Sequence, residues 1–303
     1  MADILMHVFR TFIKQNGKTK DFKIIAPSKC STLVVGDCSV NRSLLLLAAV
    51  TAASELGLKV SFFTQVQIQS LPGSLHESMS NLSPDNLKKI TFSYPRSLED
   101  LLQDVASLHE SASGSAAPPS LIIVDGLEGY LRGPGVSGGL QQAEQSSAAP
   151  PSLIIVDGLE GYLRGPGVSG GLQQAEQSSA AHISALLYDT AAFLSQTLEE
   201  RAASLAPCRV IASFQSEWEG HASGDSSDPV LSVLDRYFQV RCTLDQDWNS
   251  APAVAGPQDT WHVYLSGAGI TEDPIAKDEE DSSLAREWRL VICPNRSMEF
   301  TMV

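Results

Sequence analysis

The sequence lacks the features of a disulfide-stabilised or zinc-binding protein. Only five cysteines occur in 303 residues, and no two of them form a C-x-x-C pair. The six histidines show no spacing typical of metal ligands. We therefore expect reduced, buried thiols, which are typical of a cytosolic or nuclear protein.

Membrane spans and secretory signals are missing as well. No apolar run reaches the roughly 18 residues of a membrane helix. The longest candidate, residues 44–53, is short and closes at Glu55. The N-terminus carries His7 and Arg10 among its apolar residues, and no cleavage-type site follows. We expect no membrane association.

Positive charge is scarce, because the net charge is −14. This excludes a basic nucleic-acid coat, so any DNA contact needs a local patch or a partner. The clearest local excess lies in residues 1–30, where six basic residues outnumber two acidic ones by four. These are Arg10, Lys14, Lys18, Lys20, Lys23 and Lys29, against Asp3 and Asp21.

Within this first segment, apolar residues between positions 4 and 13 recur at helical spacing. They predict an amphipathic helix whose apolar face requires a partner surface, followed by a basic linker. Two interpretations stay open, a docking helix with a solvated linker and a DNA contact. We take residues 1–30 as a unit distinct from a core of residues 31–303.

Buried strands and helices alternate along this core, which predicts an α/β sheet. The first glycine-containing turn spans residues 36–43, and the acidic stretch 271–283 is expected to be a solvated loop. The expected strands are 31–35, 59–64, 90–94, 121–125, 209–214, 240–244, 261–265, 288–293 and 298–303. The expected helices are 44–56, one beginning at the N-cap Ser97, 183–198 and 228–237.

The turn at residues 36–43 resembles a phosphate-binding loop. The pattern G-x-x-x-x-G-K-[ST] lies between a strand and a helix, where backbone N–H groups cradle phosphates and the final hydroxyl reaches Mg²⁺. Gly36 and Ser43 match it, whereas Asn41 replaces the second glycine and Arg42 the lysine. Asn tolerates left-handed backbone, and Arg keeps the charge but is larger and planar. The alternative is a plain strand-turn-helix in which Ser43 is an N-cap.

An acid at the end of a buried strand is the second candidate. Strand 121–125 ends in Asp125, and an identical strand ends in Asp157. In P-loop NTPases an acid at this place holds Mg²⁺. The alternative for either residue is an ordinary Asp-Gly turn.

Gln215 is the third candidate, because it directly follows the buried strand 209–214. In RecA-type ATPases a polar residue there senses the γ-phosphate, although Gln215 can equally be a loop residue. Such enzymes also place a water-activating Glu after the strand that is 59–64 here. Gln65 and Gln67 stand in that region, and an amide cannot take a proton from water. Slow hydrolysis or none is expected.

Residues 115–149 and 147–181 are identical, with an offset of 32. A functional solenoid would have diverged repeats and at least three units. Two undiverged copies indicate a very recent duplication or an error in assembling the gene model. The sheet has one slot for this strand, so either residues 121–125 or residues 153–157 fill it. One of the segments 115–146 and 147–178 is therefore redundant, and its glycine-rich parts tolerate being looped out.

With these elements placed, the chain resembles the RecA-like recombinase-paralogue ATPases. Within them it is most similar to the small ATPases associated with a SWIM-domain zinc-finger protein in a Shu-type complex. The segments that carry the resemblance are residues 69–72, 87–95, 119–131, 185–192 and 236–238, with the terminal hairpin around Glu287 and Trp288.

The resemblance implies a RecA-like P-loop NTPase core with a mostly parallel sheet and a C-terminal antiparallel hairpin. It implies a nuclear factor of homologous recombination and DNA repair that binds ATP, Mg²⁺ and single-stranded DNA. The implied partners are the SWIM-domain protein, the recombinase and its paralogues.

Two functions remain open. The first is an ATPase stimulated by single-stranded DNA, and the second is a non-hydrolysing scaffold for recombinase assembly. They differ in whether a loop with Asn41 and Arg42 at the glycine and lysine positions of the motif still supports hydrolysis. A metabolic P-loop kinase would carry an arginine-rich lid, which the sequence does not show.

The duplication yields the first testable prediction. Deletion of residues 115–146 is expected to leave a folded protein, because it restores one strand for one slot. Thermal unfolding of the full and deleted forms measures this. An insoluble deletion form, or one that melts far below the full chain, would contradict the prediction.

Overall fold

The computed structural model describes residues 2–12, 30–69, 83–114, 117–132, 168–201, 207–216, 228–247, 259–267, 286–293 and 297–303. Several expectations lie outside these residues, namely the basic linker, Asp157 with its strand, and the acidic stretch 271–283. Among the described helices, none is long and apolar enough to cross a membrane. All five cysteines are free.

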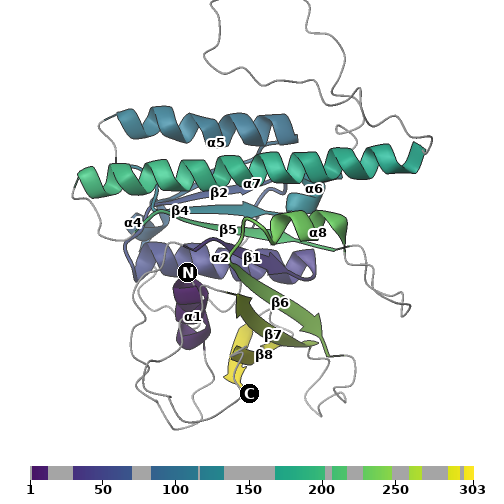
Figure 1. The fold of residues 1–303 in the computed structure, drawn as a ribbon. Helices are drawn as coiled ribbons and strands as arrows, with labels where there is room; N and C mark the ends of the chain where they lie inside the picture. Colours follow the sequence, from purple (N-terminus) through teal and green to yellow (C-terminus); the bar gives the residue numbers. More distant parts are fainter. Residues whose placement is uncertain are drawn as a thin grey trace, which may run out of the picture.

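A single sheet of nine strands organises the described part of the chain (Figure 1). Its order is β3-β2-β4-β5-β1-β6-β7-β8-β9. The strands are β1 (Thr32–Val35), β2 (Val60–Thr64), β3 (Ile90–Ser93), β4 (Leu121–Asp125), β5 (Arg209–Phe214), β6 (Val240–Gln246), β7 (Asp259–Gly267), β8 (Arg286–Ile292) and β9 (Met298–Met302).

The predicted α/β fold with a mostly parallel sheet is confirmed. All pairings from β3 through β6 are parallel, whereas β6–β7, β7–β8 and β8–β9 are antiparallel. The antiparallel end is thus larger than the single hairpin expected. In β6 and β7 buried residues alternate with partly buried ones, so one face packs on the core and the other is more accessible to solvent.

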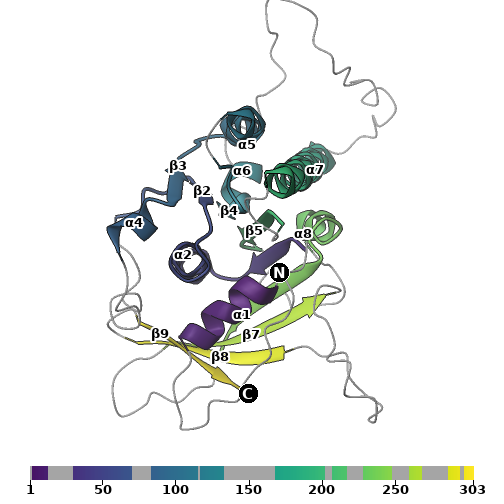
Figure 2. The ribbon, with the colours of Figure 1, turned by 90° about the vertical axis from the view of Figure 1, so that its left-hand side faces the viewer.

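Helices cover both faces of the parallel strands (Figure 2). The helices are α1 (Ala2–Thr11), α2 (Cys38–Ser54), α4 (Pro84–Leu87), α5 (Leu98–Ser113), α6 (Leu127–Leu131), α7 (Val168–Glu200) and α8 (Pro229–Leu234). One hydrophobic cluster joins α1 and α2 to one face, and a second joins α5, α6, α7 and α8 to the other. Ile122 and Ile123, successive residues of β4, belong to different clusters, as the alternation of a strand requires.

Two helix ends differ from expectation. Helix α7 begins at Val168 rather than 183, because its first turns carry glycine and polar residues that hide the apolar periodicity. Helix α8 opens after the predicted Asp228 but ends at Leu234. The N-cap of α5 at Ser97 forms as expected, and Asp100 completes a capping box that was not predicted.

Helix α1 docks on its own chain and not on a partner. Ile4, Leu5 and Phe9 are fully buried. The ring of Phe9 lies 5.5 Å from that of Trp288 and 4.7 Å from that of Phe300. The expected partner surface is therefore internal, since α2 and the antiparallel strands cover this apolar face.

This packing predicts a large loss of stability for Phe9→Ala. Truncating a fully buried Phe removes contacts and leaves a cavity, which costs about 3–5 kcal/mol. Tyr188→Ala is the control, because Tyr188 is 55% exposed and its truncation should cost about 0.5 kcal/mol or less. Urea unfolding of both variants measures the free energies. Equal costs would contradict the docking of α1.

Candidate functional site

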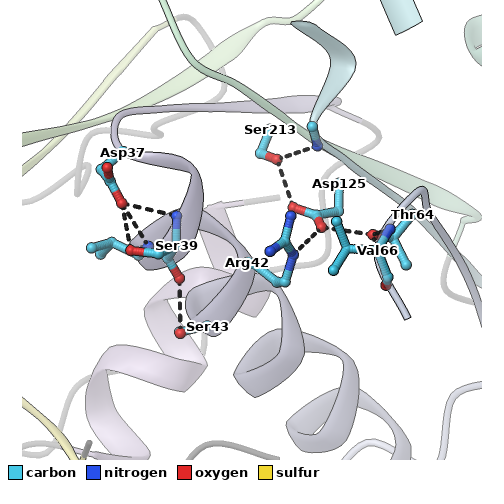
Figure 3. A network of polar contacts seen from close by, with 10 residues as sticks. Asp37, Ser39, Arg42, Ser43, Thr64, Val66, Asp125 and Ser213 are labelled. Atoms are coloured by element: carbon cyan, nitrogen blue, oxygen red, sulfur yellow. Dashed lines mark hydrogen bonds and ion pairs between the residues drawn. The ribbon is translucent and has the colours of Figure 1, made fainter. Parts of the chain in front are cut away.

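The turn that should hold phosphate is mostly helical. Helix α2 begins at Cys38, so only Gly36 and Asp37 remain outside it, and the predicted turn over residues 36–43 is wrong. The reason is a helix cap that the motif search overlooked. The carboxylate of Asp37 accepts hydrogen bonds from the backbone N–H groups of Ser39 (2.8 Å) and Val40 (3.4 Å) (Figure 3). Asp is among the best N-cap residues, which fixes the helix start early.

Gly36 is required for close packing. A Cβ at this position would lie 2.9 Å from the Cβ of Leu244, and 3.2 Å from the amide oxygen of Asn41. Asn41 is 1% exposed, and its side-chain amide donates to the carbonyl of Gly36 (2.9 Å). These two residues thus fasten the start of α2 against β6 instead of shaping an open loop.

The helix N-terminus does not offer a phosphate site in this arrangement. A phosphate would need free N–H groups in the first turn. The N–H groups of Ser39 and Val40 are bonded to the Asp37 carboxylate, and that of Asn41 to the Asp37 carbonyl (2.9 Å). Burial would raise the pKa of Asp37, but hydrogen bonds from Ser39 and Val40 leave it lowered. An ionised carboxylate therefore occupies the position that an anion would take.

Arg42 forms an ion pair with Asp125. The two residues are candidates from different motifs, and the fold brings them together. The Nε of Arg42 lies 2.6 Å from Oδ2 of Asp125. The Asp125 side chain is 1% exposed and the Arg42 side chain 27%. Thr64 donates to the same oxygen (2.9 Å), and Ser213 donates to Oδ1 (3.3 Å) (Figure 3). Both carboxylate oxygens of Asp125 are thus engaged by protein groups.

Sequence reasoning missed Thr64 and Ser213. Both are polar residues near the ends of buried strands, β2 and β5, which flank β4 in the sheet. Because the carboxyl ends of parallel strands meet at one edge, a polar residue there is a recognisable signal for this site.

These residues do not fit a Mg²⁺ ion in this arrangement. The cation that Asp125 faces is the guanidinium of Arg42. The hydroxyl of Ser43 donates to the carbonyl of Ser39 on its own helix (2.9 Å) and not to Asp125. In the part of the chain that the structure describes, no group of three or more His, Cys, Asp or Glu could hold a metal.

Gln215, the proposed phosphate sensor, is held beside α6. Its backbone N–H donates to Glu128 (2.9 Å), and Arg132 donates to its carbonyl (3.5 Å). Arg132 also pairs with Asp228, the N-cap of α8, at 2.7 Å. Burial raises the pKa of Glu128. Glu128 and Arg132 were not predicted, although both lie just after the strand acid inside the duplicated segment.

No family model matches this chain. It is similar to the ATPase SWSAP1 of Mus musculus, with 32% identity over 209 residues, which are 69% of this chain and 56% of the relative. It is also similar to the ATPase SWSAP1 of Homo sapiens, with 29% identity over 237 residues, which are 75% and 80% of the two chains. The chain spans about half the length of the mouse relative.

These matches confirm the resemblance to the recombinase-paralogue ATPases that the sequence predicted. Among solved structures, this chain is similar to a KaiC-like protein of Pyrococcus horikoshii OT3. The match covers 91% of this chain and 90% of the KaiC-like chain. Its TM-score is 0.46 and its identity 10%, a similarity too distant to support a conclusion.

The ion pair at the site predicts an asymmetric response to mutation. Arg42→Ala leaves the buried Asp125 carboxylate without its counter-charge and should cost about 3 kcal/mol. Arg42→Lys keeps the charge and should cost less. Arg241→Ala is the control, because its partner Asp235 is 39% exposed and exposed pairs contribute about 1 kcal/mol or less. Urea unfolding compares the three. An Arg42→Ala cost no larger than that of the control would show that the pair contributes little.

Proposed function

We propose that this chain, as a relative of the SWSAP1 ATPases, is a nuclear homologous-recombination and DNA-repair factor that serves as a non-hydrolysing scaffold. Its partners are a SWIM-domain protein, the recombinase and its paralogues, and single-stranded DNA. The main support for a scaffold is the ion pair of Arg42 with Asp125, on a helix α2 that is capped by Asp37.

Three parts of an ATPase site are filled by groups of the wrong kind. Phosphate would meet the Asp37 carboxylate, and Mg²⁺ would have to displace Arg42 from Asp125. At the place of the water-activating Glu, Gln65 donates to the carbonyl of Arg96 (3.1 Å) and holds the turn after β3. An amide in that role cannot accept a proton. Each departure alone would slow turnover, and together they support its loss.

The core itself remains well formed, which suits a protein selected for binding partners. The ion pair, the capped α2 and the packed helices hold the sheet and its helices together through protein groups. The alternative, a DNA-stimulated ATPase, requires α2 to unwind at its first turn and Arg42 to leave Asp125. The experiments below distinguish the two.

The first expected outcome concerns ATP. Phosphate release by the purified chain should stay at background with or without single-stranded DNA. ATP binding, followed by calorimetry, should be weak or undetectable. A robust rate that Arg42→Ala abolishes would establish the ATPase instead.

Matched variants separate charge from loop geometry. Asp37→Asn keeps an N-cap but removes the negative charge, so it tests whether repulsion alone excludes ATP. The triple variant Asp37→Gly, Asn41→Gly and Arg42→Lys restores the glycine and lysine that the motif calls for. We expect ATP binding to rise stepwise from wild type to Asp37→Asn to the triple variant, without rapid hydrolysis, because Gln65 is unchanged.

The second expected outcome concerns DNA. Phosphate contacts supply most non-specific affinity, and a chain at −14 has few cations to make them. Binding of labelled single-stranded DNA should be weak and salt-sensitive for the chain alone, and tighter with the SWIM-domain partner. Fluorescence anisotropy at two salt concentrations measures both.

A variant with Gln at positions 14, 18, 20, 23 and 29 serves as the control for the basic segment. It should lose most of the affinity that the isolated chain retains. Tight binding by the isolated chain with little salt dependence would contradict the need for a partner and would indicate a DNA site within the core.

A further inference from the structure

We propose that helix α7 and the cavity beside it form a docking surface for a segment of a partner protein. The segment presents one large apolar side chain with a Lys or Arg on either side of it. The surface lies at the amino ends of β1 and β5, opposite the edge at which Arg42 pairs with Asp125. The inference does not depend on the proposed function, because it concerns a different part of the molecule.

A cavity of about 290 Å³ opens between α7 and the first residues of these two strands. Tyr188, Ala191 and Ala192 form its wall on α7, and Cys208 and Val210 form the wall at the start of β5. An apolar cavity of about 150 Å³ accepts benzene. This cavity therefore has room for one Leu, Met or aromatic side chain.

The two hydroxyl groups of the cavity wall are already engaged. The hydroxyl of Ser195 donates to the carbonyl of Ala191 (2.6 Å) and accepts from the backbone N–H of Cys208 (2.9 Å). The hydroxyl of Ser31 donates to the carbonyl of Tyr237 (2.8 Å). A side chain that enters the cavity meets hydroxyl groups that have partners, which favours an apolar occupant.

Tyr188 lines the cavity and is exposed at the same time. The residue is 55% exposed, which is high for a large side chain on a packed helix. Helix α7 lies between α5 and α8, and Figure 2 shows no other described element over its outward side. An exposed Tyr beside a cavity is typical of an interface anchor, because its ring is apolar and its hydroxyl tolerates water.

The charge around the cavity selects a basic partner. Helix α7 carries four acids and no Lys or Arg, and the neighbouring α5 also carries four acids and no Lys or Arg. The two helices together contribute −8 to the net charge of −14. A surface of one sign steers and orients a partner of the other sign. Nucleic acids and anionic membranes would be repelled.

Two carboxylates stand at the two ends of the cavity along α7. Asp189 directly follows Tyr188, and Glu199 lines the cavity ten residues further on. At 1.5 Å per residue they are about 15 Å apart along the helix axis. Within the described part of the chain, neither carboxylate has a hydrogen-bond or ion-pair partner. A cation on each side of the apolar anchor would pair with both.

Selection from random 12-residue peptides displayed on phage identifies the chemistry of the occupant. The library is selected on the full chain and depleted on the variant Ala192→Arg, in which a bulky cation replaces an exposed residue of the cavity. We expect the enriched peptides to share one large apolar residue with a Lys or Arg within about five residues on each side. Acidic peptides, or peptides without a consensus, would overturn the proposal.

Fluorescence anisotropy of the best enriched peptide then locates its site. Tyr188→Ala should weaken binding about fivefold. The double variant Asp189→Asn and Glu199→Gln should weaken it about tenfold at low salt and less at high salt. Gln174→Arg is the control, because it adds a cation to an exposed position of α7 about 21 Å before Tyr188, and it should bind as wild type does. Thermal unfolding verifies that each variant keeps the fold.

The basic segment of this chain is the competing occupant. The variant with Gln at positions 14, 18, 20, 23 and 29 tests it, because removal of a competitor would strengthen peptide binding. Unchanged affinity supports a separate partner, whereas tighter binding would assign the surface to this chain and overturn the proposal. Equal affinities of wild type, Tyr188→Ala and the double variant would overturn it as well, since the peptide would then bind elsewhere.

Discussion

The buried carboxylate of Asp125 is the constraint on which the site depends. A carboxylate that is 1% exposed needs a compensating charge and hydrogen bonds, because an unpaired buried charge is strongly unfavourable. In an active P-loop enzyme a metal ion supplies much of that compensation. Here Arg42 does so from the same chain, together with Thr64 and Ser213. The buried acid is therefore compensated by protein groups alone in this structure.

The start of α2 follows from the same requirement, that polar groups find partners within the chain. A glycine-rich loop leaves its N–H groups free for a ligand, whereas Asp37 satisfies them internally. Once the helix starts at Cys38, position 42 falls inside α2, where its side chain reaches the end of β4. The cap therefore sets the helix start, and the helix start places Arg42 beside Asp125.

Much of the fold and of the candidate site could be predicted from the sequence. The spacing and composition of the apolar residues predicted the ends of all nine strands to within two or three residues. Buried β-branched runs bounded by turns leave few alternatives to a strand. The acid, the arginine and their proximity were predictable from the order of motifs. The early start of α2 was not, because a motif matched by position says nothing of competition from a local cap. The internal docking of α1 was also missed, since an apolar helical face shows that it needs a cover but not which surface provides it.

The two ends of the described chain meet in the fold, and this bears on how the protein is made. The backbone N–H of Phe300 donates to the carbonyl of Phe12 at 3.0 Å, and the ring of Phe300 packs against Phe9. During synthesis α1 leaves the ribosome long before β9, the strand that carries Phe300. The part of the apolar face of α1 that packs on this strand must therefore stay exposed, or be shielded by a chaperone, until β9 has been synthesised. The parallel strands can assemble earlier, so this end of the molecule is where a stalled or truncated nascent chain would be vulnerable to aggregation.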